Sequence, residues 1–212
     1  MGENSRRCVL IGGAPIGNYD EIRAHIAPGD FIIACDGGLY HTDALGVTPS
    51  LIVGDFDSHP TPDTDIETIA LPCEKDDTDT VFAVREAERR GYNDFTLIGV
   101  TGGRLDHTLG NVSILLYLDA RGLSGRIVDD HSEMEIVSGT PARIKDGCAY
   151  FSLLAISGAA EGVTITGAKY PLSNARIDCE YQYGISNEVL PGMTAAVTVR
   201  SGRLLLCKIR HE

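Results

Sequence analysis

Short aliphatic runs alternate with stretches of helical periodicity through residues 1–130, and this alternation constrains the fold more than any other feature. Apolar runs that end in Gly or Asp are typical of buried strands. Strands joined by helices predict a mostly parallel sheet with helices on both faces. The predicted strands are Cys8–Ile11, Phe31–Cys35, Leu51–Val53, Ile66–Leu71, Phe95–Val100 and Arg126–Val128, and the predicted helices are Tyr19–His25, Leu39–Leu45, Thr80–Arg90 and Asn111–Ala120.

The pattern changes after Asp130. "CAYFSLLAI" and "GVTITG" indicate short strands, and "MTAAVTVRSGRLLLCKIR" contains two extended runs around Ser201-Gly202, which predict a hairpin. No stretch of three helical turns follows Asp130. The predicted fold class is therefore α/β: a mostly parallel α/β sheet domain over residues 1–130, then a small antiparallel, β-sandwich-like domain over residues 131–212.

Charge and composition exclude several classes of protein. The net charge is −12 over 212 residues, and no run of Lys or Arg is longer than two, which argues against nucleic-acid binding. The apolar run near the N-terminus, Cys8 to Ile11, is too short for a signal or membrane helix. We therefore expect no membrane partner and a cytoplasmic protein. None of the six cysteines forms a C-x-x-C pair, so zinc and redox motifs are unsupported.

Carboxylates gather in the loops that follow four of the predicted strands. The carboxyl ends of parallel strands meet at one edge of a sheet, where ligands bind in this class of fold. These loops contain seven aspartates, one Lys and one Arg in the segments Asp36-Gly37-Gly38, Gly54-Asp55-Phe56-Asp57, Lys75-Asp76-Asp77-Thr78-Asp79 and Thr101-Gly102-Gly103-Arg104-Leu105-Asp106-His107.

Electrostatic repulsion favours a cation in this region. A single Asp after a strand is more often a turn residue or a helix cap, but several carboxylates close together do not all stay ionised without compensation. Magnesium prefers oxygen ligands and keeps positions for water and substrate phosphate. Two Asp from one loop and one from another would leave such positions open.

The glycines of the same edge suggest phosphate binding. Gly102-Gly103 lets backbone N–H groups approach an anion, and Arg104 can bind its oxygens in a forked geometry; the alternative is a tight turn with a solvated Arg. His107 can be a general hydrogen-bond donor or only a partner of Asp106. Gly12 to Tyr19 lacks the Lys of a P-loop and the spacing of a dinucleotide-binding motif. The residues thus predict magnesium-dependent phosphoryl or nucleotidyl transfer to a small molecule, without identifying the nucleophile.

Together these motifs resemble the thiamine pyrophosphokinase family, which carries an Asp-Gly-Gly element, a G-D-x-D-S element, a K-D-x-T-D element and a G-G-R-x-D-H element in that order. All four occur here, at Asp36, Gly54 to Ser58, Lys75 to Asp79 and Gly102 to His107, and Asn111 fits an asparagine just beyond. "GAKYPL" (Gly167 to Leu172) and "GISNE" (Gly184 to Glu188) resemble signatures of the family's β domain. The resemblance covers about residues 8–209.

The resemblance implies a homodimer that transfers a pyrophosphoryl group from ATP to the hydroxyl of thiamine and releases AMP, with each active site between one catalytic half and the partner's β half. It implies Mg²⁺ bound by Asp55, Asp57 and Asp79, and Asp36 as a further catalytic residue that also faces thiamine. Ser186 and Asn187 are expected near thiamine, where some members place a tryptophan that this chain lacks. The residues expected to bind ATP are Lys75, Thr101, Gly102, Gly103, Arg104, Asp106 and His107.

Two alternatives stay open at this point. A related group of pyrophosphokinases acts on a hydroxymethylpterin and shares some of the acidic motifs. A non-catalytic thiamine or nucleotide sensor is the second alternative, although carboxylates kept close together lower stability unless a metal is bound, which favours an enzyme.

Overall fold

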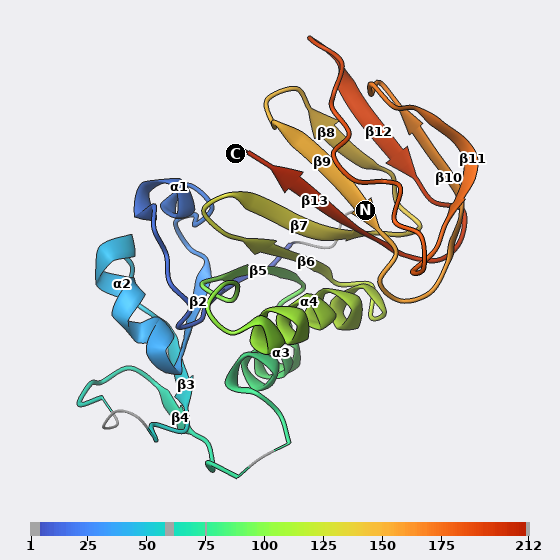
Figure 1. The fold of residues 1–212 in the computed structure, drawn as a ribbon. Helices are drawn as coiled ribbons and strands as arrows, with labels where there is room; N and C mark the ends of the chain where they lie inside the picture. The colour runs from blue at the N-terminus through green and yellow to red at the C-terminus, as the bar shows by residue number, and fades with distance from the viewer. Residues whose placement is uncertain (1–4, 58–61, 75, 211–212) are drawn as a thin grey trace. The chain divides into compact units, whose positions relative to one another are not determined.

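The computed structural model describes residues 5–57, 62–74 and 76–210, so Lys75 lies outside the described residues (Figure 1). Contacts divide the chain into two compact units, Met1–Asp130 and His131–Glu212, which are called unit 1 and unit 2 below. None of the described helices is long and apolar enough to cross a membrane.

Unit 1 contains a parallel sheet. Its strands lie in the order β4-β3-β2-β1-β5-β6, and each neighbouring pair is parallel. The strand order reverses between β1 and β5, which is where ligands bind in open α/β sheets. The strands are β1 (Arg7–Ile11), β2 (Phe31–Cys35), β3 (Leu51–Gly54), β4 (Thr68–Ala70), β5 (Asp94–Ile98) and β6 (Ser124–Val128).

Helices cover both faces of this sheet, as Figure 1 shows. Val9, Ile11 and Ile32 form one core with Ile22 of α1 and Leu45 of α2, because alternate residues of a strand point to the same face. α3 packs against β1, β2 and β3, and α4 packs against β6. The helices are α1 (Tyr19–Arg23), α2 (Leu39–Leu45), α3 (Asp79–Arg89) and α4 (Leu105–Asp119), with a short 3-10 turn η1 (Asp36–Gly38) before α2.

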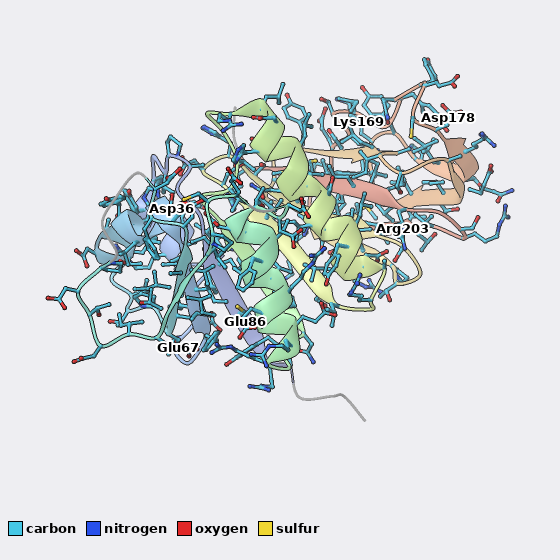
Figure 2. The ribbon with its side chains drawn as sticks, turned by 90° about the horizontal axis from the view of Figure 1, so that it is seen from below. Asp36, Glu67, Glu86, Lys169, Asp178 and Arg203 are labelled. Carbon is cyan, nitrogen blue, oxygen red and sulfur yellow. The ribbon has the colours of Figure 1, made fainter. Side chains whose placement is uncertain are left out.

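The C-terminal end of α3 is held by ion pairs. Arg90 binds Glu86 of α3 and Glu67, just before β4, at 2.8 and 2.6 Å, and the two glutamates lie near each other in Figure 2. Glu86 also pairs with Arg89. These contacts connect the C-terminal end of α3 to the edge of the sheet.

α4 begins at Leu105, well before the predicted start at Asn111. Its first turns expose Leu105 and Leu109, at 71% and 60%, so the apolar periodicity that identifies a buried helix face is weak there. Asp106 is consequently a residue of the first helical turn, as is His107, and neither belongs to the preceding loop.

The strands of unit 2 are antiparallel and belong to two sheets: β7-β13-β9 are the last three strands of a nine-stranded sheet, and β11-β10-β12-β8 form a separate four-stranded sheet. Phe151 and Leu206 of one sheet share a core with Val163 and Val197 of the other, which is the packing of a β-sandwich. The fold class predicted from the sequence is confirmed, and the described residues after Asp130 form no helix. The strands are β7 (Ser132–Val137), β8 (Ala142–Lys145), β9 (Tyr150–Leu154), β10 (Ala160–Thr166), β11 (Leu172–Ile177), β12 (Thr194–Thr198) and β13 (Leu204–Ile209).

The hairpin predicted around Ser201-Gly202 is wrong. β12 pairs with β10 and β8, whereas β13 pairs with β7 and β9, so the chain passes from one sheet to the other at this point. Glu161 donates its backbone N–H to the Ser201 carbonyl at 2.8 Å. Gly202 has φ of +86°, and a Cβ there would lie 2.4 Å from the carbonyl oxygen of Ala159. Glycine at this position therefore allows the chain to pass closely by Ala159 as it moves from one sheet to the other.

Candidate active site

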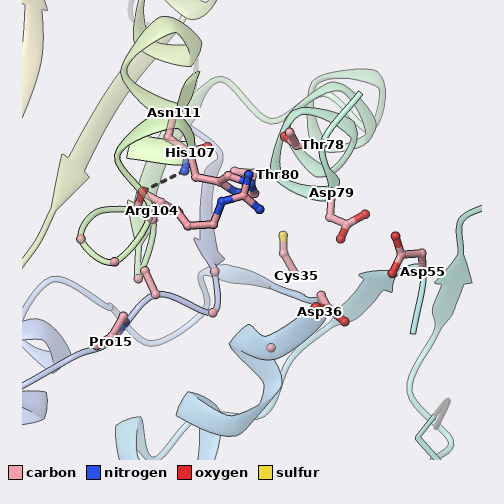
Figure 3. Close-up of a pocket in the computed structure, with 18 residues that line it drawn as sticks. Pro15, Cys35, Asp36, Asp55, Thr78, Asp79, Thr80, Arg104, His107 and Asn111 are labelled. Carbon is pink, nitrogen blue, oxygen red and sulfur yellow. Dashed lines mark hydrogen bonds between the residues drawn. The ribbon is translucent and has the colours of Figure 1, made fainter. Parts of the chain in front are cut away.

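A cavity of about 500 Å³ lies in unit 1, at the edge where the parallel strands end. It sits beside the reversal of strand order between β1 and β5, and loops after several strands contribute to it (Figure 3). Its lining residues are Gly12, Gly13, Ala14, Pro15, Cys35, Asp36, Gly37, Asp55, Thr78, Asp79, Thr80, Gly99, Val100, Gly102, Gly103, Arg104, His107 and Asn111.

One wall of the cavity is acidic. Asp36, Asp55 and Asp79 come from the ends of β2 and β3 and from the first residue of α3, and their side chains lie around the same space in Figure 3. Asp36 has φ of +44°, and a Cβ on Gly54 would lie 3.2 Å from its Cα. The glycine thus permits the close approach of the β2 and β3 ends that brings the aspartates together.

The acidic wall suits a hard cation, but it is not a complete metal cage. Its donors are carboxylate oxygens, which Mg²⁺ prefers, yet the described residues contain no group of three His, Cys, Asp or Glu side chains arranged to hold a metal ion. Such an arrangement fits a cation that takes its remaining oxygens from water and from substrate phosphate.

Asp57 does not line the cavity together with Asp55 and Asp79. It is exposed and outside the lining of the cavity, and its backbone N–H donates to Asp55 Oδ1 at 3.2 Å. The predicted magnesium ligands Asp55 and Asp79 are therefore brought together without Asp57. The role of each as a metal ligand stays a prediction.

The opposite wall carries Gly102, Gly103, Arg104 and His107. Both glycines have positive φ, +87° and +60°, a conformation that glycine adopts without strain. Arg104 binds the Asp106 carboxylate at 2.5 Å, with the two side chains 71% and 66% exposed. The guanidinium lowers the pKa of Asp106 to about 2, so Asp106 is ionised at neutral pH and holds Arg104 at the rim.

The side chains of two further motif residues of this region, Thr101 and Asn111, bind other groups of the protein. The Thr101 hydroxyl donates to Asp129 Oδ2 at 3.1 Å, and neither Thr101 nor Asp106 belongs to the cavity lining. Buried Asn111 donates from Nδ2 to the Val100 carbonyl at 2.8 Å. Asn111 thereby fixes α4 to the end of β5.

The segment Gly12 to Pro15 and the side chains of Cys35, Thr78 and Thr80 also line the cavity, although none was predicted to do so. Applying the strand-end rule to the first predicted strand would have found Gly12 and Gly13. Burial, followed by the charge of Asp79, raises the pKa of Cys35. The thiol is therefore neutral at physiological pH.

Ser186 and Asn187 lie in unit 2. Asn187 is 5% exposed, donates from Nδ2 to the Tyr170 carbonyl at 2.8 Å, and accepts from the backbone N–H groups of Tyr170 and Glu188 at 3.0 and 2.9 Å. Ser186 is exposed, has φ of +55°, and donates its backbone N–H to Ser152 Oγ. Asn187 thus holds two signature segments together, and the contact of both residues with thiamine stays a prediction.

Comparison with known proteins gives one family for both units. The model "Thiamin pyrophosphokinase, catalytic domain" matches residues 22–125, and "Thiamin pyrophosphokinase, vitamin B1 binding domain" matches residues 142–204. The thiamine pyrophosphokinase of Bacillus subtilis (strain 168) is 27% identical in an alignment 189 residues long, which covers 85% of this chain and 88% of that protein.

Solved structures share the fold along nearly the whole chain. The thiamin pyrophosphokinase of Geobacillus thermodenitrificans superposes with a TM-score of 0.84 at 27% identity, over 97% of this chain and 98% of that one. The Bacillus subtilis structure, at 23% identity, has a TM-score of 0.86 over 97% and 100% of the two chains and supports the fold alone. Because models of one family match both units, the chain belongs to the thiamin pyrophosphokinase family.

Proposed function

We propose that this protein transfers the pyrophosphoryl group of ATP to the hydroxyl group of thiamine, which gives thiamine diphosphate and AMP. The observation that carries the proposal is the cavity in which an acidic wall of Asp36, Asp55 and Asp79 faces a glycine and arginine wall. This pairing suits a polyphosphate with a divalent cation. The match of unit 2 to a vitamin B1 binding domain favours thiamine over a hydroxymethylpterin.

The residues of the cavity have distinct proposed tasks. Arg104 and the backbone of Gly102 and Gly103 hold phosphate oxygens, with His107 beside them. Asp55 and Asp79 offer oxygens to Mg²⁺, the G-D-x-D motif supports Asp57 as a further ligand, and Asp36 faces thiamine. When bound, Mg²⁺ would offset the negative charge that develops on the phosphate groups during transfer.

The transfer is a displacement at the β-phosphorus of ATP. The hydroxyl oxygen of thiamine forms the new bond to this phosphorus, the bond to the oxygen that bridges the α and β phosphates breaks, AMP leaves and a proton is released. Fixing both reactants in line supplies much of the rate enhancement in such reactions. The acidic wall also lowers the cost of desolvating the positively charged thiamine ring.

The decisive experiment incubates the protein with ATP and Mg²⁺ and either thiamine or a hydroxymethylpterin, and follows AMP together with the mass of the product. AMP and thiamine diphosphate formed in equal amounts support the proposal. A pyrophosphorylated pterin would support the first alternative instead. Binding of ATP and thiamine without AMP would indicate a sensor.

We also propose that the enzyme works as a homodimer in the cytoplasm, with Ser186 of one subunit near the thiamine bound by the other. The test mixes two inactive variants, Asp79→Asn and the bulky Ser186→Trp, under conditions of reversible dissociation. If sites are shared, a mixed dimer contains one site with both lesions and one with neither, so part of the activity returns. No recovery despite proven subunit exchange would mean that each site is built within one chain.

A further inference from the structure

The loop between β1 and α1 forms one side of the cavity and is held mainly through its backbone N–H groups. Gly12 and Ala14 donate to the carbonyls of Ile98 and Gly99, both at 2.8 Å. Farther along, Gly17 and Asn18 donate to the carboxylate of Asp130 at 2.7 and 2.9 Å. These bonds fix the loop to the ends of β5 and β6. The backbone carbonyl of Ala14 takes part in none of them and has a different partner.

That partner is His41, which lies on α2. Its Nε2 is 3.1 Å from the Ala14 carbonyl oxygen, and its Nδ1 is 2.8 Å from the Tyr19 hydroxyl. A carbonyl only accepts, so Nε2 carries the hydrogen, and the Nδ1 of a neutral ring accepts from Tyr19. Burial lowers the pKa of His41, opposed by the Ala14 carbonyl, so the ring is neutral at pH 7.

The same helix is joined to the acidic side of the cavity. α2 follows directly after Asp36 and the two glycines of its motif. The backbones of Gly13 and Gly37 are in contact, since a Cβ on Gly13 would lie 3.1 Å from the Gly37 Cα. His41 therefore connects the β1–α1 loop to the helix that begins at the Asp36 loop, and both loops line the cavity.

We propose that His41 is a positioning residue that holds the Ala14 segment against the Asp36 loop and so sets the shape of this side of the substrate cavity. The identity of the substrates rests on the proposed function. His41 itself is not part of the cavity lining, so it acts through Ala14 and Pro15. A shift of about 1 Å in a binding loop is enough to weaken substrate positioning substantially.

The competing explanation is that His41 only adds stability. The test therefore compares four variants: His41→Ala, His41→Gln, Tyr19→Phe, and Asp43→Asn as a control on an exposed position of α2. His41→Ala removes the bond to Ala14. His41→Gln retains an N–H donor that can reach the carbonyl, and Tyr19→Phe keeps the ring contact but removes the hydroxyl that orients His41.

Steady-state kinetics gives the functional result. His41→Ala raises the KM for ATP or for thiamine about 3- to 10-fold, the effect of one lost hydrogen bond, with little change in kcat. His41→Gln recovers most of this loss, Tyr19→Phe falls between, and Asp43→Asn equals the wild type. A lower Tm with both KM values unchanged would overturn the proposal.

Hydrogen exchange in the free protein tests the loop without any substrate. His41→Ala speeds amide exchange in residues 12–18, and His41→Gln restores protection there. Unchanged exchange in this segment would overturn the proposal. This result decides the role of His41 even if the wild type forms no AMP, so failure of the proposed function is distinguished from failure of this inference.

Discussion

Several motif residues of unit 1 line a cavity, whereas the motif residue Asn187 of unit 2 binds the backbone of its own unit. In unit 1, Asp36, Asp55, Asp79 and Arg104 surround a cavity. In unit 2, Asn187 uses its side chain on the backbone of Tyr170 and Glu188, so it holds its own unit together. Similarity to a family motif therefore identifies two kinds of residue, those that face a ligand and those that fix the segments around it.

Sheet topology explains this difference. The parallel strands of unit 1 all end at one edge, so residues far apart in the chain meet there around an open space. The antiparallel strands of unit 2 end at both edges, and a long connection such as residues 178–193 must satisfy its own backbone groups. The buried side chain of Asn187 supplies hydrogen-bond partners for backbone groups of Tyr170 and Glu188. Four predictions test the contrast, starting with the largest expected effect.

The first prediction concerns the acidic wall. Asp79→Asn should lower pyrophosphoryl transfer by about 100-fold or more, because removing one charge-stabilising group from a catalytic site typically costs this much. The circular dichroism spectrum and Tm should stay close to those of the wild type. Asp77→Asn, two positions earlier in the chain and paired with Arg85, serves as the control. Full activity in Asp79→Asn would contradict the assignment of the acidic wall.

The second prediction concerns the opposite wall. Arg104→Ala should weaken ATP binding roughly 10-fold or more, since a hydrogen bond to a charged phosphate is lost. Isothermal titration with ATP and Mg²⁺ measures the affinity, and Arg143→Ala at an exposed position of unit 2 is the matched control. An unchanged ATP affinity would remove Arg104 from the phosphate site.

The third prediction concerns unit 2 and is a loss of stability. Asn187→Ala should lower the free energy of unfolding by about 1–3 kcal/mol, because part-buried backbone groups of Tyr170 and Glu188 lose their hydrogen-bond partner. Denaturant titration measures it, with the exposed Ser173→Ala as the control. If stability were retained and only the KM for thiamine rose, Asn187 would face the ligand, and the contrast between the units would fail.

The fourth prediction concerns pH and is the smallest effect. Hydrogen bonds from Arg89 and then Arg90 outweigh burial and lower the pKa of Glu86 to about 2, below the unfolded value of about 4.3. Its stabilising contribution is therefore present above about pH 4.3 and is lost as pH falls towards 2. We expect the wild type to exceed Glu86→Gln by about 1 kcal/mol at pH 7, a value reduced by solvent screening.

Urea titration of both proteins between pH 7 and pH 2.5 measures this difference. The difference in the free energy of unfolding between the wild type and Glu86→Gln should narrow as the pH falls below about 4.3. A gap that does not depend on pH would show that Glu86 stabilises α3 by packing and not by charge.

Much of unit 1 could be predicted because its signals are local. The strand Phe31–Cys35 and the helix Leu39–Leu45 have the predicted bounds, since short apolar runs and a glycine after a helix report on their own segments. The gathering of motif residues at one edge follows from strand direction alone. The start of α4 was missed because its first turns are exposed.

The sequence by itself determined the two fold types, the edge of the sheet that carries the chemistry and the family of the chain. Only the tertiary structure decided that β12 and β13 belong to different sheets, that Asp57 lies outside the cavity and that Thr101 binds Asp129. The physical reason is that periodicity reports which face of a segment is buried, whereas the partner of a strand or of a side chain depends on contacts with residues distant in the chain.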